Sequence, residues 1–141
     1  MMTPSQTILA IIPARAGSKR LKNKNMLKLG DIPLIEWSIN AAKQSENVTK
    51  LVVNSDDLKI KDLCKKINVE FIQRPAELAQ DTSSSLDVIL HTISYMKKKG
   101  QFFENILLLQ PTSPFRTHQH IDEAYEALIS KKADGIISLR E

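Results

Sequence analysis

The residues best suited to chemistry stand in one stretch near the amino end, IIPARAGSKRLKNKN, at positions 11–25. It begins as an apolar run and changes at Arg15 into Gly, Ser, Asn and cations. Arg15 can donate two parallel hydrogen bonds to phosphate oxygens, Lys24 can add a point charge, and backbone N–H groups with the Ser18 hydroxyl can line an anion. The stretch therefore predicts a loop that binds a compact polyphosphate. The alternative is that this loop is solvated and binds no ligand, since basic runs usually are solvated.

The distribution of charge along the chain supports the polyphosphate prediction. The 141 residues carry a net charge of +4, yet the first acidic residue is Asp31. The thirty residues before it carry +6 and the remainder carries −2. A general polyanion binder spreads its cations along a face, whereas a cluster behind one strand suits a compact ligand. The six cations of this cluster are Arg15, Lys19, Arg20, Lys22, Lys24 and Lys28.

Two well-known phosphate-binding motifs are excluded. A P-loop requires G-x-x-x-x-G-K-[ST], and a dinucleotide-binding turn requires G-x-G-x-x-G before a helix. This loop has only Gly17, followed by Ser18 and Lys19.

Apolar runs with the length of buried strands alternate with segments of helical periodicity. The predicted strands are 8–13, 51–54, 69–72, 106–110 and 135–139. The predicted helical stripes, each at i, i+3, i+4 and i+7, are Ile60, Leu63, Cys64 and Ile67; Leu86, Ile89, Leu90 and Ile93; and Ile121, Ala124, Tyr125 and Leu128. A further helix opens at Pro33, and its predicted buried residues are Ile35, Ile39 and Ala42. The predicted N-caps are Ser55, Ser84 and Thr117.

This alternation predicts an α/β fold: one Rossmann-like domain over residues 1–141, with a doubly wound, mainly parallel sheet and helices on both faces. In such sheets ligands bind outside the carboxyl ends of the strands, near the point where the strand order reverses. The basic loop, Ser55 to Asp57, QRPAELAQDTSSS and QPTSPFRT each follow a predicted strand. All of the unusual polar chemistry is therefore expected at one edge of the sheet.

Composition favours a soluble protein of the cytoplasm. Cys64 is the only cysteine, so an internal disulfide is impossible and a reducing compartment fits. The apolar run at 8–13 is far too short to span a membrane, and it lacks the flanks of a signal peptide. We therefore expect no membrane partner.

Three motifs, IIPARAGSKRLKNKN, RPAELAQDTSSS and LLLQPTSPFRT, occur in an order and spacing that closely resemble the CMP-N-acetylneuraminate synthetases, also called acylneuraminate cytidylyltransferases. The resemblance runs from about Ile8 to the last residue. It implies a nucleotidyltransferase fold, transfer of CMP from CTP to the anomeric hydroxyl of a sialic-type nonulosonic acid, and release of pyrophosphate. It also implies a Mg²⁺ requirement, a homodimeric full-length enzyme and a role in cell-surface polysaccharide synthesis.

The resemblance assigns roles to nine residues. Arg15 and Lys24 are the expected catalytic residues, within a nucleotide-phosphate loop formed by Arg15, Ser18, Lys19, Lys24 and Asn25. The expected cytidine pocket holds Arg74 and Ser85, and the expected acceptor-sugar side holds Gln110 and Arg116. Ser85 is equally suited to starting a helix, and Arg74 to pairing with a carboxylate such as Glu77. The loop departs from the family pattern at Ala16, Arg20 and Lys22, where members commonly have Gly, Gly and Pro.

No metal ligand is predicted within these residues. QPTSP contains no acid, and Asp56 and Asp57 resemble the start of a helix. The family places its metal-binding carboxylates beyond the position of Glu141. We therefore expect an N-terminal fragment that alone has weak CTP affinity and little synthetase turnover.

Two rival functions remain. One is another sugar cytidylyltransferase of the 3-deoxy-octulosonic acid type, although those enzymes typically carry an Asp where this chain has Pro111 and Thr112. The other is a non-catalytic nucleotide-binding domain. Nucleic-acid binding is not expected, because the aromatic residues that would stack bases are predicted in helices away from the basic loop: Trp37, Tyr95 and Tyr125.

Overall fold

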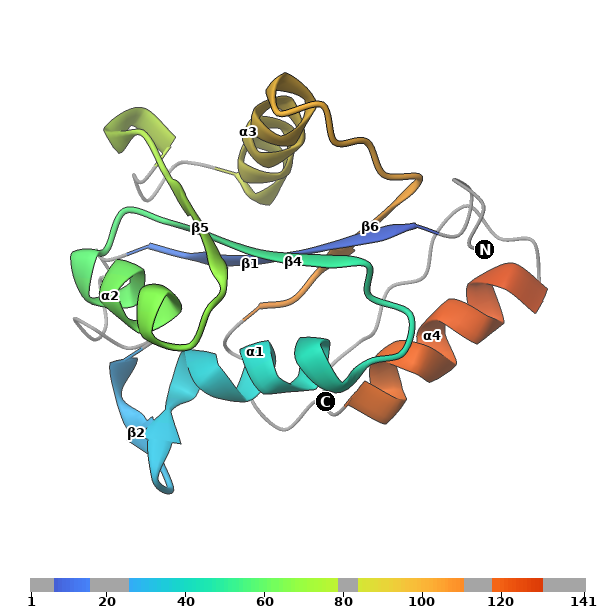
Figure 1. Ribbon diagram of the computed structural model, residues 1–141, viewed down its shortest axis with the longest axis horizontal. Coiled ribbons are helices and arrows are strands. Elements are labelled where there is room, and N and C mark those ends of the chain that lie inside the picture. The colour runs from blue at the N-terminus through green and yellow to red at the C-terminus, as the bar shows by residue number, and fades with distance from the viewer. Residues whose placement is uncertain (1–6, 16–25, 79–83, 111–117, 131–141) are drawn as a thin grey trace.

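A four-stranded parallel sheet forms the centre of the molecule in the computed structural model, which describes residues 7–15, 26–78, 84–110 and 118–130 (Figure 1). The strand order is β5-β4-β1-β6, and every neighbouring pair is parallel. The predicted parallel α/β sheet is confirmed, while the predicted strand at 135–139 lies outside the described residues. The strands are β1 (Ile8–Ala14), β4 (Lys50–Ser55), β5 (Glu70–Gln73) and β6 (Asn105–Leu108).

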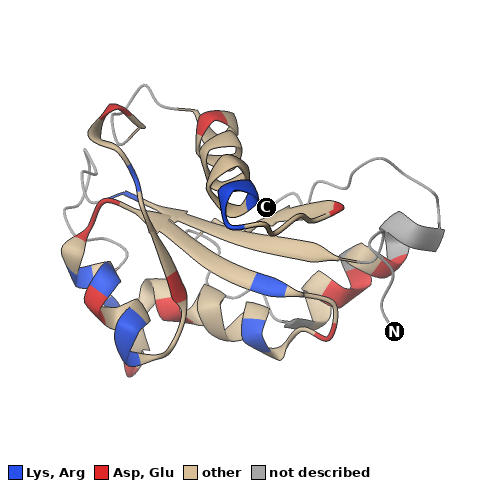
Figure 2. Cartoon of the chain, turned by 45° about the horizontal axis from the view of Figure 1, so that its top comes forward, with Lys and Arg blue, Asp and Glu red and all other residues tan. Residues whose placement is uncertain are grey.

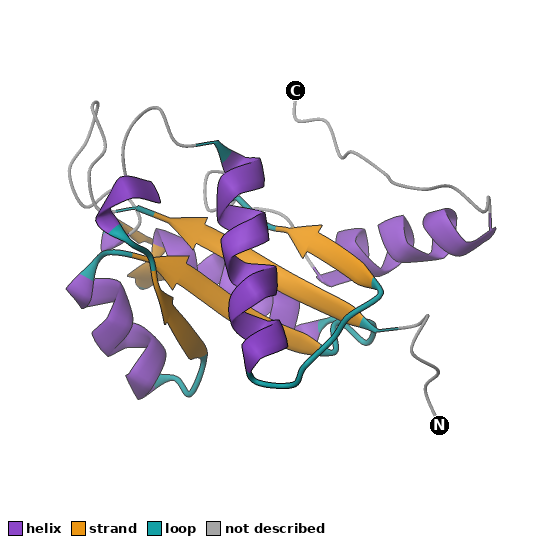
Figure 3. Cartoon of the chain, turned by 90° about the horizontal axis from the view of Figure 1, so that it is seen from above, coloured by secondary structure: helices purple, strands orange, loops and turns teal. Residues whose placement is uncertain are grey.

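Helices cover both faces of the sheet (Figures 1 and 3). The chain passes from β1 outward to β4 and β5, then returns to the other side of β1 to form β6. Right-handed crossovers place the helices of the outward and return paths on opposite faces, which explains the doubly wound arrangement. One face carries α1 (Leu34–Gln44), α2 (Leu58–Lys66) and α4 (His118–Ser130), and the other carries α3 (Ser85–Lys98). Among the described residues, none of these helices has both the length and the apolar character needed to cross a bilayer.

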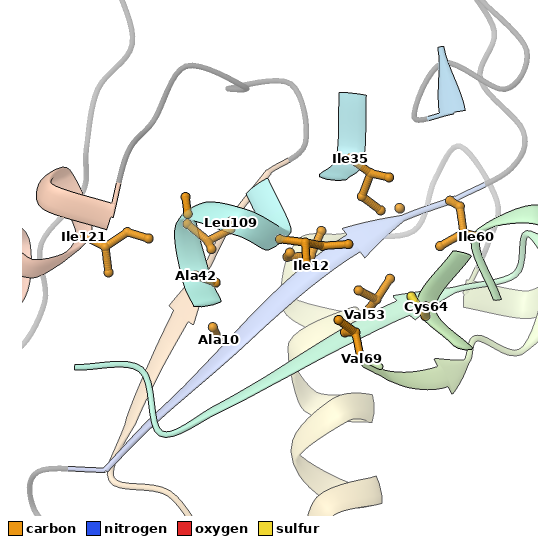
Figure 4. Close-up of a cluster of buried hydrophobic side chains, with 13 residues drawn as sticks. Ala10, Ile12, Ile35, Ala42, Val53, Ile60, Cys64, Val69, Leu109 and Ile121 are labelled. Carbon is orange, nitrogen blue, oxygen red and sulfur yellow. The ribbon is translucent and has the colours of Figure 1, made fainter. Parts of the chain in front are cut away.

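Strand β1 is the centre of the hydrophobic core. Its side chains alternate, so that Ala10 and Ile12 pack in the cluster with α1 and α2, whereas Leu9 and Ile11 pack in the cluster with α3. Figure 4 shows the first cluster, which also receives Ile121 from α4. Burial on both faces explains why this strand is a continuous apolar run.

A small antiparallel hairpin and one short helix complete the described elements. The hairpin strands β2 (Lys28–Leu29) and β3 (Ile32–Pro33) meet at a turn in which Gly30 has a φ of 73°, a conformation that favours glycine. Helix α1 starts directly after Pro33, as predicted, and buries Ile35, Ile39 and Ala42. A 3₁₀ helix, η3 (Ala76–Leu78), follows β5.

The predicted N-caps have three different outcomes. Ser84 caps α3 and forms a capping box with Asp87, as predicted. Ser55 does not cap α2, because β4 continues through it; the cap is Asp57, whose Oδ1 accepts a hydrogen bond from the Lys59 amide at 2.9 Å. The Ser55 hydroxyl instead accepts from the Asp57 amide at 3.0 Å. Thr117 lies outside the described residues.

The predicted apolar stripe of α3 is wrong by part of a turn. Leu86 and Leu90 are 61% and 55% exposed, and the buried residues of the helix are Val88, Thr92 and Met96. The polar Thr92 faces the sheet because it hydrogen-bonds with a buried asparagine of β4, and a pattern of apolar residues cannot reveal such a partner. The stripe of α2 is confirmed, because Ile60 and Cys64 are fully buried and the half-buried Leu63 and Ile67 pack against the same cluster.

Helix α4 is fixed to the loop between α1 and β4 through the carboxylate of Asp122. Its oxygens accept hydrogen bonds from the Ser45 hydroxyl, from the Asn47 side chain at 2.8 Å and from the Glu46 amide at 3.4 Å. Partial burial pushes the pKa of Asp122 upward, but these hydrogen bonds outweigh burial and the pKa is lowered overall. The carboxylate therefore contributes stability in its ionised form.

Asp122→Asn is expected to lower the free energy of unfolding by about 1 kcal/mol at neutral pH, the low end for hydrogen bonds to a charged group, because the site is partly exposed. Since the folded pKa lies below the unfolded value, this contribution is present above that value and lost as the pH falls through the folded pKa. Urea denaturation should show the two proteins converging as the pH falls below the ordinary value of 3.8. Glu123→Gln, at the exposed neighbouring position, is the matched control. A gap that persists unchanged in acid would contradict the assignment.

Candidate functional site

The carboxyl ends of three adjacent strands bring charged residues together. The register pairs Ala14 of β1 with Ser55 of β4, and Ser55 with Gln73 of β5. The residues that follow this row, Arg15, Asp56 and Arg74, are therefore neighbours along one edge of the sheet. Adjacent strands lie about 4.8 Å apart, so the backbones of the two arginines are roughly 10 Å apart.

Arg74 is a buried guanidinium held by the neighbouring strand. It is 4% exposed, and its amide donates to the Ser55 carbonyl at 2.8 Å. Its Nε donates to Oδ1 of Asn54 at 2.9 Å, and its Nη2 donates to the Asn54 carbonyl at 3.0 Å. The hydrogen bonds that position this side chain thus run to Asn54 of β4, a partner that the sequence analysis did not identify.

The electrostatics of this edge favour an anionic ligand. Burial lowers the pKa of Arg74, Asp56 acts in the opposite direction, and Arg15 lowers it further. Arginine remains protonated in proteins, so Arg15 and Arg74 place two positive guanidinium groups at this edge. Figure 2 shows that charge is otherwise carried mainly by the helices and by the ends of the strands. A phosphate-bearing ligand would relieve the mutual repulsion of the two cations.

Two more of the predicted site residues, Ser85 and Gln110, are described by the structure and lie at the same edge. Ser85 is the exposed first residue of α3, directly after the cap at Ser84, so the capping hydrogen bond does not depend on it. Gln110 is exposed just beyond β6, where the Leu109 amide donates to the Ile11 carbonyl at 2.9 Å. Because α3 runs back toward the start of β6, Ser85 at the beginning of α3 lies at the carboxyl edge of the sheet. The predicted site residues outside the described part of the chain are Ser18, Lys19, Lys24, Asn25 and Arg116.

The described residues do not supply a magnesium site by themselves. Within the described ranges, no group of three or more His, Cys, Asp or Glu side chains is arranged to hold a metal ion. Asp56 lies at the same edge as the guanidinium groups of Arg15 and Arg74, and their positive charge disfavours binding of a metal cation there. Cys64 is fully buried in the core, where burial raises the pKa of its thiol to about 11, so it is not a thiolate ligand or nucleophile.

Three further residues belong to this site and were not predicted from the sequence: Asn54, His91 and Thr92. Asn54 and Thr92 are completely buried, and His91 is half-buried beside them. One feature of the sequence could have indicated Asn54: it is a polar residue at the end of an otherwise apolar predicted strand, next to the site edge. Its partners on α3 are 37 and 38 residues further along the chain, so no local pattern identifies them.

A doubly wound parallel sheet with helices on both faces and two guanidinium groups at its carboxyl edge defines a Rossmann-like α/β domain, a class in which ligands bind at that edge. Its fold is similar to that of CMP:2-keto-3-deoxy-manno-octonic acid synthetase complexed with CTP, with a TM-score of 0.74 and 22% identity over 90% of this chain and 49% of that one. The model of the cytidylyltransferase family matches residues 9–140, and the chain belongs to this family.

Curated relatives confirm the resemblance that the three motifs indicated. The N-acylneuraminate cytidylyltransferase of Escherichia coli O18:K1:H7 (strain RS218 / NMEC) is 46% identical over 117 residues, which are 83% of this chain and 27% of that protein. The CMP-N,N'-diacetyllegionaminic acid synthase of Legionella pneumophila is 42% identical over 84% of this chain and 52% of its own length. The chain thus spans between about a quarter and a half of the length of these relatives.

Proposed function

We propose that this protein transfers CMP from CTP to the anomeric hydroxyl of a nonulosonic acid and releases pyrophosphate. The observation that carries the proposal is the pair Arg15 and Arg74, which follow β1 and β5, the strands on either side of β4, at the carboxyl edge of a cytidylyltransferase domain. Two guanidinium groups at that edge can bind opposite ends of one nucleotide, with Arg15 on the phosphates and Arg74 on the pyrimidine carbonyl.

The reaction asks the protein mainly for positioning and charge neutralisation. The sugar oxygen attacks the α-phosphorus in line, a new phosphorus–oxygen bond forms, and the bond to the β-phosphate oxygen breaks. Negative charge then grows on the departing pyrophosphate, where Arg15 and Lys24 would offset it. The proposed supporting contacts are Ser18, Lys19 and Asn25 on the phosphates, Ser85 in the cytidine pocket, and Gln110 and Arg116 on the acceptor sugar.

The proposal includes three properties that do not rest on the described residues. A requirement for Mg²⁺ and a homodimeric enzyme rest on the family resemblance, and a cytoplasmic location rests on the composition, in which Cys64 is the only cysteine. Mg²⁺ would neutralise phosphate charge when bound, and within the described residues no group of three or more His, Cys, Asp or Glu side chains could hold it. The steps assigned above to the arginines and lysines do not depend on where those ligands lie.

The choice of acceptor follows from the relatives. They are named for N-acylneuraminate, for N,N'-diacetyllegionaminic acid and, at 31% identity, for pseudaminic acid. The likeness to the octonic acid synthetase, at 22% identity, supports the fold alone. We therefore favour a nine-carbon acid over an eight-carbon acid. Nucleic acid is disfavoured because Trp37, Tyr95 and Tyr125 lie in helices, as predicted.

The test combines nucleotide competition with turnover. CTP should outcompete ATP and single-stranded oligonucleotides in a binding assay with the protein. Pyrophosphate release by the full-length enzyme in the presence of Mg²⁺ should require both CTP and a nine-carbon acid, with N-acetylneuraminate, diacetyllegionaminate and pseudaminate tested beside the eight-carbon acid. Equal competition by ATP, or release that depends on the eight-carbon acid alone, would overturn the proposal.

A further inference from the structure

A chain of buried hydrogen bonds links the ends of β4 and β5 to the middle of α3. Asn54 is its centre: Oδ1 accepts from Nε of Arg74 at 2.9 Å, and Nδ2 donates to Oγ1 of Thr92 at 2.9 Å. The same Nδ2 lies 3.1 Å from Nδ1 of His91. Thr92 in turn donates to the Val88 carbonyl at 2.8 Å.

The donors and acceptors of this chain allow only one arrangement. A guanidinium can only donate, so the Asn54 oxygen must face Arg74 and its amino group must face α3. Thr92 has already given its proton to Val88, so its oxygen accepts. The second amide proton of Asn54 then requires an unprotonated Nδ1 on His91, which makes that ring neutral with its proton on Nε2.

The surroundings of His91 agree with a neutral ring. Burial lowers the pKa of His91, and the charges of Arg74 and Lys98 lower it further, while Glu77 acts in the opposite direction. Arg74 directly follows β5, Lys98 belongs to α3 and Glu77 belongs to η3. Both acceptors of the Asn54 amino group are thereby available at neutral pH.

We propose that Asn54, held by Thr92 and His91, is the positioning residue that orients the Arg74 guanidinium toward the base of the bound nucleotide. This inference rests on the proposed function, in which Arg74 contacts the cytosine. Two of the five N–H donors of Arg74 are committed to Asn54, on Nε and Nη2. Because the guanidinium is planar and rigid, fixing one edge determines the direction of the opposite edge.

A purely structural network would have a different signature. If these residues only stabilise the packing of α3 on the sheet, losing one hydrogen bond should lower the free energy of unfolding without changing ligand binding. If they orient Arg74, the loss should appear in the binding of a ligand that contains the base. Inorganic tripolyphosphate lacks the base, so it reports on the phosphate loop alone.

The experiment compares Thr92→Val with Thr92→Ser. Valine has nearly the shape of threonine but cannot accept the Asn54 proton, whereas serine keeps the hydroxyl. Titration calorimetry with CTP and with tripolyphosphate, together with urea denaturation, should be performed on the protein and both variants. We expect Thr92→Val to bind CTP about fivefold to tenfold more weakly, with tripolyphosphate binding and the Thr92→Ser variant within about twofold of wild type.

A second pair of variants covers the case in which valine at position 92 prevents folding. His91→Leu removes the other acceptor at a half-buried position, and His91→Gln restores an acceptor oxygen. The leucine variant should lose CTP affinity selectively and the glutamine variant should recover it. Unchanged CTP affinity in both acceptor-deleting variants, or equal losses for CTP and tripolyphosphate, would overturn the inference. Failure of the wild-type protein to prefer CTP over ATP would instead overturn the proposed function.

Discussion

Replacing Arg15 by glutamine is expected to lower the turnover of pyrophosphate release by about a hundredfold to a thousandfold, the effect of removing one preorganised charge from a transition state. Arg15 directly follows Ala14, the buried last residue of β1, which is paired with Ser55 of β4. Its backbone is therefore held rigidly at the site edge. Steady-state rates of the full-length enzyme at saturating CTP and acceptor measure the effect, and the loss should appear in kcat because the departing pyrophosphate gains charge in the transition state.

Lys65→Gln is the matched control for the loss of one positive charge. Lys65 is exposed in the last turn of α2, whose direction is opposite to that of the strands, so it lies toward the amino edge of the sheet. We expect its turnover to remain within about twofold of wild type, because an exposed charge far from the site is screened by salt. If Arg15→Gln were no slower than Lys65→Gln, Arg15 would have no special role in neutralising the phosphates.

The sheet and its functional edge could be predicted because their physical causes are local in the sequence. The apolar run ending at Ala14 is continuous since β1 is buried on both faces, and a change to polar residues at Arg15 marks the point where the strand leaves the core. A polar stretch likewise begins at the end of β5, with Gln73 and Arg74. Parallel strands bring such points to one edge, so the positions of both arginines followed from pattern alone.

The support of Arg74 could not be predicted because its causes are distant in the sequence. Asn54 needs acceptors on α3, and this need turns Thr92 toward the sheet while Leu86 and Leu90 face solvent. Hydrophobic periodicity ranks those leucines as the buried face, since it counts apolar side chains and not the unmet hydrogen bonds of a neighbouring strand. A buried polar group must be paired, and that requirement decided the rotation of the helix.

Arg74→Lys is expected to weaken CTP binding by about tenfold to a hundredfold while preserving the charge. A lysine ammonium is a single point of donation, so it cannot bond to Oδ1 and the carbonyl of Asn54 and also present a second, oppositely directed edge to a base. At this buried position the replaced contacts cannot be recovered from water. Titration calorimetry with CTP measures the loss, and kcat at saturating CTP should change less than the affinity, because the reacting phosphates lie at the Arg15 end of the site.

Arg74→Lys could weaken CTP binding in two ways, by changing the direction of the N–H donors or by destabilising the fold, and the two must be measured separately. Arg74→Lys should also lower the free energy of unfolding, by about 1–3 kcal/mol, because Oδ1 of Asn54 is left with a poorer partner in a buried place. Tripolyphosphate binding distinguishes the two effects: it should survive in a folded variant that has lost only its base contact. Because lysine retains the charge of Arg74, a selective loss of CTP affinity would assign the contribution to the direction of the N–H donors. If Arg74→Lys bound CTP as tightly as wild type, Arg74 would not contact the base, and the cytidine pocket would have to lie elsewhere along the sheet edge.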